Sequence, residues 1–244
     1  MPRFFISKDN ISDNTLYIEG DDARHIARSL RMAVGDEITA SDGEGEEYAA
    51  ILTKIRDERV DADITSHMPS PSEPPVKITL YMAYPKGDKL ETVIQKAVEL
   101  GASRIVPFES SRCIKRPSQD KAEAKRVRLS RIALEAAKQC GRGIVPDVAL
   151  PLSYSAALSE AASADLALFC YEDEEGRSIK DALGEAKSAR TISVMVGSEG
   201  GFSPEEAASA KAAGMISVGL GPRILRCETA PDYALSAISY HFEL

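Results

Sequence analysis

The chain has 244 residues, a formal net charge of −8 and a sequence pI near 5.1. This length has room for one large domain or two modest ones, with a real hydrophobic core. The acidic balance excludes a uniformly basic nucleic-acid binder, but it leaves room for a local basic surface. Trp is absent and aromatic residues make up only 6% of the chain, which argues against a broad platform for base stacking.

The sequence contains no sign of secretion, membrane insertion or metal binding. The N-terminal residues form no apolar signal segment, and no apolar run reaches the roughly 18 residues that a membrane span requires. The four cysteines lie far apart without a C-x-x-C pair, and the three histidines are equally dispersed. We therefore expect a reduced, cytoplasmic protein with no structural metal and no membrane partner.

Residues 1–70 are predicted to form a small β-barrel. Strands are expected at residues 4–6, 16–18, 36–41, 46–55 and 60–65. One helix is expected to begin at Asp21 or Asp22 and to end at Gly35. The stretch SHMPSPSEPP, residues 66–75, holds four prolines, which remove backbone donors and fix φ. It is therefore predicted to be neither a helix nor a central strand, and we place the domain boundary there.

Residues 71–244 show strands that alternate with helices, which predicts an α/β domain with a parallel sheet covered on both faces. Five strands are expected at residues 78–84, 104–108, 166–171, 191–196 and 215–220. Helices are expected at residues 86–100, 119–140, 154–162, 178–187 and 204–213, and from about 230 onwards. In such a sheet, ligands bind at the carboxyl ends of the strands.

A glycine-rich loop, GSEGG at residues 197–201, follows one of these strands directly. Its glycines allow the backbone to approach a ligand closely, although a tight turn alone explains them equally well. Ser203, Pro204 and Glu206 then predict a helix start closed by a capping box. The loop fits neither a Walker motif nor G-x-G-x-x-G, so its spacing alone identifies no ligand.

A second unusual loop, residues 219–231, follows the last strand and holds two glycines, two arginines and a glutamate. Ile224 and Leu225 lie between its charges, which predicts a loop that is itself buried. A surface loop with an exposed ion pair is the alternative. A third loop, the acidic stretch at residues 172–176, matches no calcium-binding pattern and is predicted to be solvated.

Charge is unevenly distributed along the chain. Residues 112–142 hold ten basic and three acidic side chains, whereas the first 72 residues hold eight basic and fifteen acidic ones. Such segregation suits contact with a phosphate backbone, and a solvated helix face is the alternative. We therefore expect the predicted helix at residues 119–140 and its flanks to provide much of any electrostatic grip on a nucleic acid.

Several longer stretches resemble one family. They are PRFF (2–5), HIARSLRMAVGD (25–36), PKGDKLETVIQKAVELG (85–101), ALEAAKQCGRGIVP (133–146), VGSEGGFSPEE (196–206) and VGLGPRILRCETA (218–230). Together they cover nearly the whole chain, in order, and they are similar to the RsmE family of ribosomal RNA methyltransferases in the SPOUT superfamily. The chain departs from the common family pattern at Ser198, Cys140 and Cys227, where the family usually has Pro, Ser and Thr.

The resemblance implies a fold and an activity. It implies a PUA-like β-barrel at residues 1–70, a SPOUT domain with a trefoil knot at residues 71–244, and a homodimer. It also implies methylation by S-adenosylmethionine of N3 of one uridine, position 1498, in 16S ribosomal RNA. The knot is implied by the resemblance alone, because the residue pattern predicts an ordinary open sheet.

The resemblance and the loops together assign roles to individual residues. The cofactor is expected at Tyr171, Val196, Gly197, Ser198, Glu199, Gly200, Gly201, Leu220, Gly221, Ile224, Leu225 and Arg226. Contacts with RNA are expected from Arg3, Arg24, Arg28, Arg31, Arg112, Lys115, Arg116 and Arg142.

The reaction assigns candidate catalytic roles as well. Because N3 lies on the Watson–Crick edge, the uridine must be unpaired or flipped. Arg223 and Arg226 are candidates for stabilising the charge that develops on O2 and O4, and Glu199 or Glu228 for accepting the proton. Cys227 is not needed as a nucleophile, because direct methyl transfer uses none.

Other classes of protein remain to be separated by experiment. A non-catalytic RNA-binding protein of the same fold would keep the basic stretch without needing two glycine-rich loops. A small-molecule α/β enzyme would use the loop at 197–201 without needing a barrel. A methyltransferase that acts on another RNA is a further alternative. The sequence also leaves open whether free 16S rRNA or an assembled small ribosomal subunit is the substrate, and which protomer supplies each contact.

Overall fold

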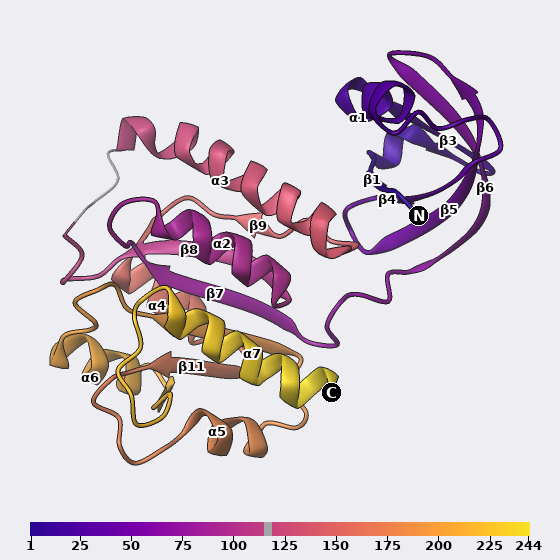
Figure 1. Ribbon diagram of the computed structural model, residues 1–244. Helices are drawn as coiled ribbons and strands as arrows, with labels where there is room; N and C mark the ends of the chain where they lie inside the picture. The colour runs from indigo at the N-terminus through magenta and orange to yellow at the C-terminus, as the bar shows by residue number, and fades with distance from the viewer. Residues whose placement is uncertain (115–118) are drawn as a thin grey trace. The chain divides into compact units, whose positions relative to one another are not determined.

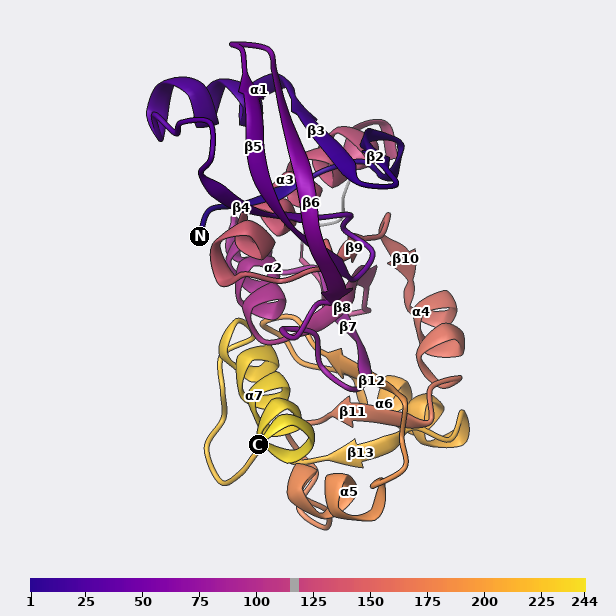
Figure 2. The same ribbon diagram turned by 90° about the vertical axis from the view of Figure 1, so that its right-hand side faces the viewer.

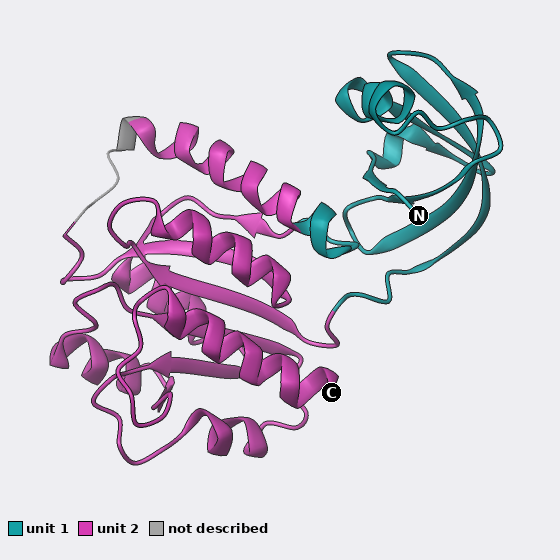
Figure 3. Cartoon of the chain, viewed as in Figure 1, with its two compact units in different colours: residues 1–73, 137–145 teal, residues 74–136, 146–244 magenta. Residues whose placement is uncertain are grey.

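The computed structural model describes residues 1–114 and 119–244 (Figure 1). The chain divides into two compact units, which Figure 3 colours separately. Unit 1 comprises residues 1–73 and 137–145, and unit 2 comprises residues 74–136 and 146–244. The boundary that we expected at residue 70 lies close to the end of the first segment. The sequence pattern did not predict that residues 137–145 return to unit 1.

Unit 1 is built on a curled six-stranded sheet (Figure 1). The strands are β1 (Arg3–Phe5), β2 (Ile11–Ser12), β3 (Thr15–Glu19), β4 (Glu37–Ser41), β5 (Glu46–Ile55) and β6 (Arg59–Pro69). They pair in the order β1-β4-β5-β6-β3-β2. Alternate strand residues enter a closed core whose members include Leu16, Ile18, Ile26, Ile38, Leu52 and Val60. A one-turn 3₁₀ helix, η1 (Lys8–Asn10), connects β1 to β2.

The predicted helix of unit 1 is shorter and less regular than expected. It consists of α1 (Gly20–Arg24) and a π-helical turn, η2 (His25–Ser29), and it ends before Gly35. Arg31 adopts a φ of 52°, which no right-handed helix allows, so the chain turns away there. Ile26 is fully buried and anchors the helical segment to the core.

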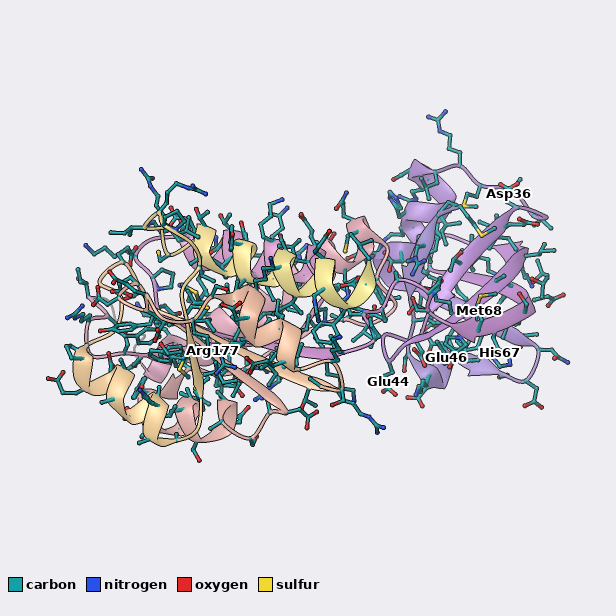
Figure 4. The ribbon with its side chains drawn as sticks, turned by 90° about the horizontal axis from the view of Figure 1, so that it is seen from below. Asp36, Glu44, Glu46, His67, Met68 and Arg177 are labelled. Carbon is teal, nitrogen blue, oxygen red and sulfur yellow. The ribbon has the colours of Figure 1, made fainter. Side chains whose placement is uncertain are left out.

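The proline-rich stretch is partly a strand, which corrects our expectation of a linker at residues 66–75. Strand β6 continues to Pro69 and pairs with β5, with His67 opposite Tyr48 and Pro69 opposite Glu46. On its other side, β3 pairs only with the segment from Arg59 to Asp63. The last residues of β6 therefore lie locally at an edge, where a proline is tolerated. Figure 4 labels His67 and Glu46 on this hairpin.

Residues 137–145 are fastened to unit 1 by a buried ion pair. The Arg142 side chain is 4% exposed, and its guanidinium donates to Glu73 Oε2 at 2.5 Å. Glu73 also accepts hydrogen bonds from the backbone amides of Gly143 and Ile144 at 2.9 and 3.0 Å. Arg142 therefore neutralises a carboxylate inside unit 1. This corrects our expectation that Arg142 contacts RNA, because a buried guanidinium held in this way does not reach a phosphate.

Unit 2 contains a parallel sheet of seven strands. They are β7 (Lys77–Ala83), β8 (Ala102–Glu109), β9 (Asp147–Val148), β10 (Leu152–Ser153), β11 (Leu166–Cys170), β12 (Thr191–Val196) and β13 (Ile216–Val218). Their order is β10-β8-β7-β12-β11-β13, and β9 pairs with β8 beside this path. The parallel sheet and strands at all five expected places are as predicted, although β13 covers only three residues of the range 215–220. The two-residue strands β9 and β10 were not foreseen.

Helices cover both faces of this sheet, as the alternating pattern predicted. They are α2 (Lys89–Glu99), α3 (Gln119–Cys140), α4 (Tyr154–Ala161), α5 (Ile179–Glu185), α6 (Pro204–Ala212) and α7 (Thr229–Glu243). Helices α2, α5 and α7 lie on one face, and α4 and α6 lie on the other (Figure 2). The carboxyl ends of β11, β12 and β13 are thereby left for the loops that follow them. Among the described residues, no helix is both long enough and apolar enough to cross a membrane.

Candidate functional site

A cavity of about 890 Å³ opens at the carboxyl ends of β11, β12 and β13. Its walls come from the segments that follow these strands, together with Lys89 of α2 and Ala230 of α7. Every residue expected to bind the cofactor lines it: Tyr171, Val196, Gly197, Ser198, Glu199, Gly200, Gly201, Leu220, Gly221, Ile224, Leu225 and Arg226. The topology thus brings together loops that are far apart in the sequence, and the binding itself stays a prediction.

Two glycines form parts of this wall where a side chain does not fit. Gly201 has a φ of 62°, and a Cβ added there would lie 1.8 Å from Glu172 Oε1. A Cβ added at Gly219 would lie 2.6 Å from the carbonyl oxygen of Glu174. Both distances are far below van der Waals contact. The glycines therefore let three loops of the cavity wall pack closely against one another.

The glycine-rich loop is held from behind by a capped helix and an aromatic cluster. Ser203 Oγ accepts from the Glu206 amide at 3.2 Å, and the Ser203 amide donates to Glu206 Oε2 at 2.9 Å. This is the capping box that the sequence predicted. Phe202 is 1% exposed and packs on Phe169 with ring centroids 4.2 Å apart. The loop is therefore fixed at its start by strand β12 and at its end by the packed Phe202 and the capped helix α6.

The Ser198 hydroxyl is an unsatisfied polar group in the cavity wall. The residue is 6% exposed, and its Oγ has no hydrogen-bond partner among the described residues. A buried hydroxyl without a partner is costly and rare, which makes it a candidate for bonding to a ligand. This is also a position at which the chain departs from the resembled family.

Lys89 connects the two candidate carboxylates. Its Nζ lies 3.2 Å from Glu199 Oε1 and 3.1 Å from Glu228 Oε2. The Lys86 amide also donates to Glu199, at 3.1 Å, and the Cys227 thiol donates to Glu228 Oε2 at 3.2 Å. Glu228 is not itself a lining residue, but its carboxylate is tied to two that are, Lys89 and Cys227. The sequence placed Lys89 in a family motif without assigning it a role.

These contacts shift the ionisation of the cluster. Hydrogen bonds to Glu228 and Glu199 raise the pKa of Lys89. The bond from the Cys227 thiol, followed by contacts that include Lys89, lowers the pKa of Glu228. Burial alone would raise the pKa of Glu199, but bonds from backbone amides and Lys89 outweigh it and lower that pKa. Burial and the bond to Glu228 raise the pKa of Cys227 to about 12. Cys227 is therefore a protonated donor at neutral pH, not a thiolate nucleophile.

Arg223 and Arg226 are the unpaired cations of the cavity. Both line it and are exposed, and neither guanidinium forms an ion pair or hydrogen bond with another described residue. Arg177, which is labelled in Figure 4, also lines the cavity but pairs with Glu185. Among the lining cations, Arg223 and Arg226 are thus available to an anionic or polarised ligand.

One expectation about the loops needs correction. Ile224 lines the cavity but is 91% exposed, so the loop at 219–231 is not buried around it. The error came from reading an apolar residue as necessarily buried. The acidic loop is solvated as expected, with Glu172 and Glu175 exposed, and it also contributes Glu172, Glu174 and Glu175 to the cavity wall.

The remaining candidates for RNA contact differ in their availability. Arg3 is held by Glu47, with its two nitrogens 2.6 and 3.0 Å from the carboxylate oxygens. Arg24 pairs with Asp21 and Arg28 with Asp57, both on the surface. Arg31 is exposed without a partner among the described residues, and Arg112 donates to the Gly200 carbonyl at 2.9 Å. Lys115 and Arg116 lie outside the described residues.

Cys113, Cys170 and Cys227 are free thiols. Among the described residues, no group of three His, Cys, Asp or Glu side chains is arranged to hold a metal ion.

Models of known protein families match both units. The model of an RNA methyltransferase domain matches residues 72–239, and the model of an RNA methyltransferase PUA domain matches residues 18–65. The second match lies within the curled sheet of unit 1. The first spans almost all of unit 2, including the cavity.

Full-length relatives show the same likeness. Ribosomal RNA small subunit methyltransferase E of Bacillus subtilis is 36% identical over 100% of this chain and 98% of its own length. The protein of that name from Synechocystis is 32% identical, over 97% of this chain and 77% of its own length. A crystal structure of ribosomal RNA small subunit methyltransferase E from Neisseria gonorrhoeae, bound to S-adenosyl methionine, is 34% identical. It covers 98% of this chain and 97% of that chain, with a TM-score of 0.85.

Proposed function

The chain belongs to the ribosomal RNA small subunit methyltransferase E family, and on this premise we propose that it methylates N3 of uridine 1498 in 16S rRNA with S-adenosylmethionine as the donor. The observation that carries the proposal is the cavity at the carboxyl ends of β11, β12 and β13. All twelve residues expected to bind the cofactor line it. Its 890 Å³ are ample for a nucleoside-sized donor and part of an acceptor base.

The cavity wall suits S-adenosylmethionine in two respects. Gly201 and Gly219 let the loops that carry them pack closely against Glu172 and Glu174, so that three loops close around one cavity of ligand size. The buried Ser198 hydroxyl offers an unused hydrogen-bonding group. The bound donor supplies its methyl group as an electrophilic carbon on a sulfonium.

The residues around this cavity then have distinct tasks. Loss of the N3 proton spreads negative charge onto O2 and O4 of the uracil ring, and Arg223 and Arg226 are the cations free to stabilise it. Positioning of the unpaired base against the donor supplies a large part of the acceleration. Glu199 and Glu228 contribute fixed negative charge beside the cavity, and Cys227 contributes a thiol donor.

RNA binding, assembly and cellular location follow as parts of the same proposal. Arg31 and Arg112 are the exposed cations that we assign to phosphate contacts. Arg24 and Arg28 can contact a phosphate as well, if each exchanges its exposed carboxylate partner for the phosphate. A homodimer is supported by apolar surface on α7, where Tyr233 and Tyr240 are 43% and 74% exposed. A ribosomal RNA substrate places the enzyme in the cytoplasm. The trefoil knot stays a prediction of the family resemblance.

The test is to map methylated uridines in rRNA from cells that lack this protein. We expect N3 methylation at position 1498 to be absent, restored by the wild-type gene and not by the gene for Arg226→Ala. Removal of one charge-stabilising donor typically slows catalysis by about 10²–10³-fold. Arg190→Ala, an exposed arginine remote from the cavity lining, is the matched control and should restore the mark.

The alternatives give different results in the same experiment. A persisting methyl mark in the deletion strain would rule out the proposal. A mark lost at another nucleotide would indicate a methyltransferase with another RNA target, and donor binding without any lost mark would favour a non-catalytic RNA-binding protein. Purified free rRNA and small subunits from the deletion strain, tested side by side, separate the two forms of substrate.

A further inference from the structure

The Lys89 side chain lies where three segments of unit 2 meet. Lys89 is the first residue of α2, and its ammonium contacts Glu199 at 3.2 Å and Glu228 at 3.1 Å. Glu199 belongs to the glycine-rich loop after β12, and Glu228 directly precedes α7. A single cation thus joins both loops that carry the proposed catalytic residues. Its side chain is 37% exposed and lines the cavity.

The groups facing this ammonium come from two neighbouring elements. They are Glu199 from the loop after β12, and Cys227 and Glu228 from the segment before α7. Cys227 Sγ lies 3.8 Å from Nζ and donates to Glu228. Each carboxylate therefore has a second donor, the Lys86 amide for Glu199 and the thiol for Glu228. The arrangement is a small closed network and not an isolated surface ion pair.

The ammonium of Lys89 offsets the repulsion between the two carboxylates of this network. Two ionised carboxylates that share one ammonium carry a net charge of −1. Without the cation, the two negative charges repel each other across a short gap. One carboxylate then takes up a proton, or the loops that carry them separate. Either change alters the wall of the cavity.

We propose that Lys89 is a positioning residue of the transferase, which ties the glycine-rich loop to the start of α7 and keeps Glu199 and Glu228 ionised together at the cavity. This deepens the proposed function and rests on it. The raised pKa of Lys89 and the lowered pKa values of both carboxylates agree with the geometry. Carboxylates held in this state are weak bases, so they serve as fixed charges, and the N3 proton leaves to solvent water at the open cavity.

The first test does not depend on catalysis. The carboxyl carbons of Glu199 and Glu228 are followed against pH by NMR in the full chain, with Glu199→Gln and Glu228→Gln to assign the signals. In Lys89→Met we expect at least one of the two to titrate at a higher pH, and Lys89→Arg to restore the wild-type titration. Lys187→Met removes an exposed lysine elsewhere in unit 2 and is the matched control. Unchanged titration of both carboxylates in Lys89→Met would overturn the proposal.

The second test measures the rate of methyl transfer in a single turnover with saturating donor. We expect Lys89→Met to be slower by about tenfold at neutral pH, because loop positions set the alignment of the reactants. We also expect the acidic limb of its pH profile to move to higher pH, because its carboxylates take up protons more readily. Circular dichroism and thermal unfolding check that the variant is folded.

A double-mutant cycle separates positioning from a general structural role. If Lys89 acts through Glu228, Lys89→Met slows a Glu228→Gln enzyme much less than it slows the wild type. An equal loss in both backgrounds at every pH would contradict the proposal. If the wild-type chain methylates no rRNA, the proposed function fails, and the NMR titration still decides whether Lys89 holds the two carboxylates ionised.

Discussion

Ser198 illustrates what a single residue contributes to this cavity and what sequence reasoning can say about it. The glycines on either side made the loop recognisable as a candidate site, because close approach of backbone is a property of the residue type. Whether the Ser198 hydroxyl finds a partner depends on atoms brought from other segments. The structure buries it without one. The residue pattern therefore predicted the loop as a candidate site, but it could not predict that the Ser198 hydroxyl has no partner.

The unsatisfied hydroxyl leads to a prediction in which removing it has opposite effects on the stability of the free protein and on its affinity for the donor. In Ser198→Ala the unsatisfied hydroxyl disappears, so we expect the free protein to be unchanged or stabilised, by up to about 1–3 kcal/mol. If the hydroxyl bonds to the donor, S-adenosylmethionine binding weakens by about five- to tenfold, which corresponds to one ordinary hydrogen bond. Thermal unfolding of the free chain and calorimetric titration of the donor measure the two effects. Weaker stability together with unchanged donor affinity would show that the hydroxyl has no role in binding.

Ile224 and Cys227 mark the limit of prediction at this scale. Both residues lie in a loop that its charges and glycines predicted to be functional. Residue type gave no indication that Ile224 would be 91% exposed while Cys227 would be buried beside two carboxylates. Exposure in a loop depends on the path of the chain, which has no hydrophobic period to reveal it.

Secondary-structure elements were predicted well where a periodic pattern fixes them. Strand β12 and helix α3 have the bounds expected from the sequence, because an apolar run and a long helical period define their ends. The two-residue strands β9 and β10 carry no such pattern, and they exist only because β8 offers them a partner. Strand β6 crosses the proline-rich stretch because its last residues have a neighbour on one side only.

The segment at 137–145 is joined to the rest of unit 1 by the contacts of the buried Glu73 carboxylate, which no apolar pattern in the sequence reveals. These contacts lead to a prediction about stability. In Glu73→Ala the buried Arg142 guanidinium loses its carboxylate, and two backbone amides lose their acceptor. Removing one partner of a buried pair costs about 3–5 kcal/mol. We expect that loss in unit 1, measured by native-state hydrogen exchange of β4, β5 and β6, because two compact units need not unfold in one step.

The control for this prediction is an exposed pair. Glu123 pairs with Arg126 on the surface of α3, with 60% of the Glu123 side chain exposed. Glu123→Ala should therefore cost less than about 1 kcal/mol. Equal losses for Glu73→Ala and Glu123→Ala would mean that burial adds nothing to the pair at Arg142, and that packing alone holds residues 137–145 in unit 1.

At the scale of the whole chain, the net charge of −8 does not show which basic side chains are paired with carboxylates and which are not. Of the basic residues between 112 and 142, Arg126, Arg128, Lys138 and Arg142 have carboxylate partners, and Lys115 and Arg116 lie outside the described residues. Lys125 lies 5.1 Å from the ring centre of Tyr84. The sequence therefore overstated the free positive charge of this stretch, because acids that pair with it, such as Asp22, Glu73 and Glu91, lie outside the stretch in sequence.

RNA binding should accordingly depend on salt through a small number of cations. Arg131 is exposed on α3 and has no partner among the described residues, so Arg131→Gln should lower the slope of log affinity against log salt by about 1 if Arg131 contacts a phosphate. Arg126→Gln should change the slope less, because Arg126 must first leave Glu123. Lys187→Gln carries the same loss of charge away from this helix and should leave the slope unchanged. Fluorescence anisotropy with an rRNA fragment at a series of salt concentrations gives all three slopes. If Arg131→Gln and the wild type have the same slope, α3 is a solvated face, and the grip on RNA has to come from Arg31 and Arg112.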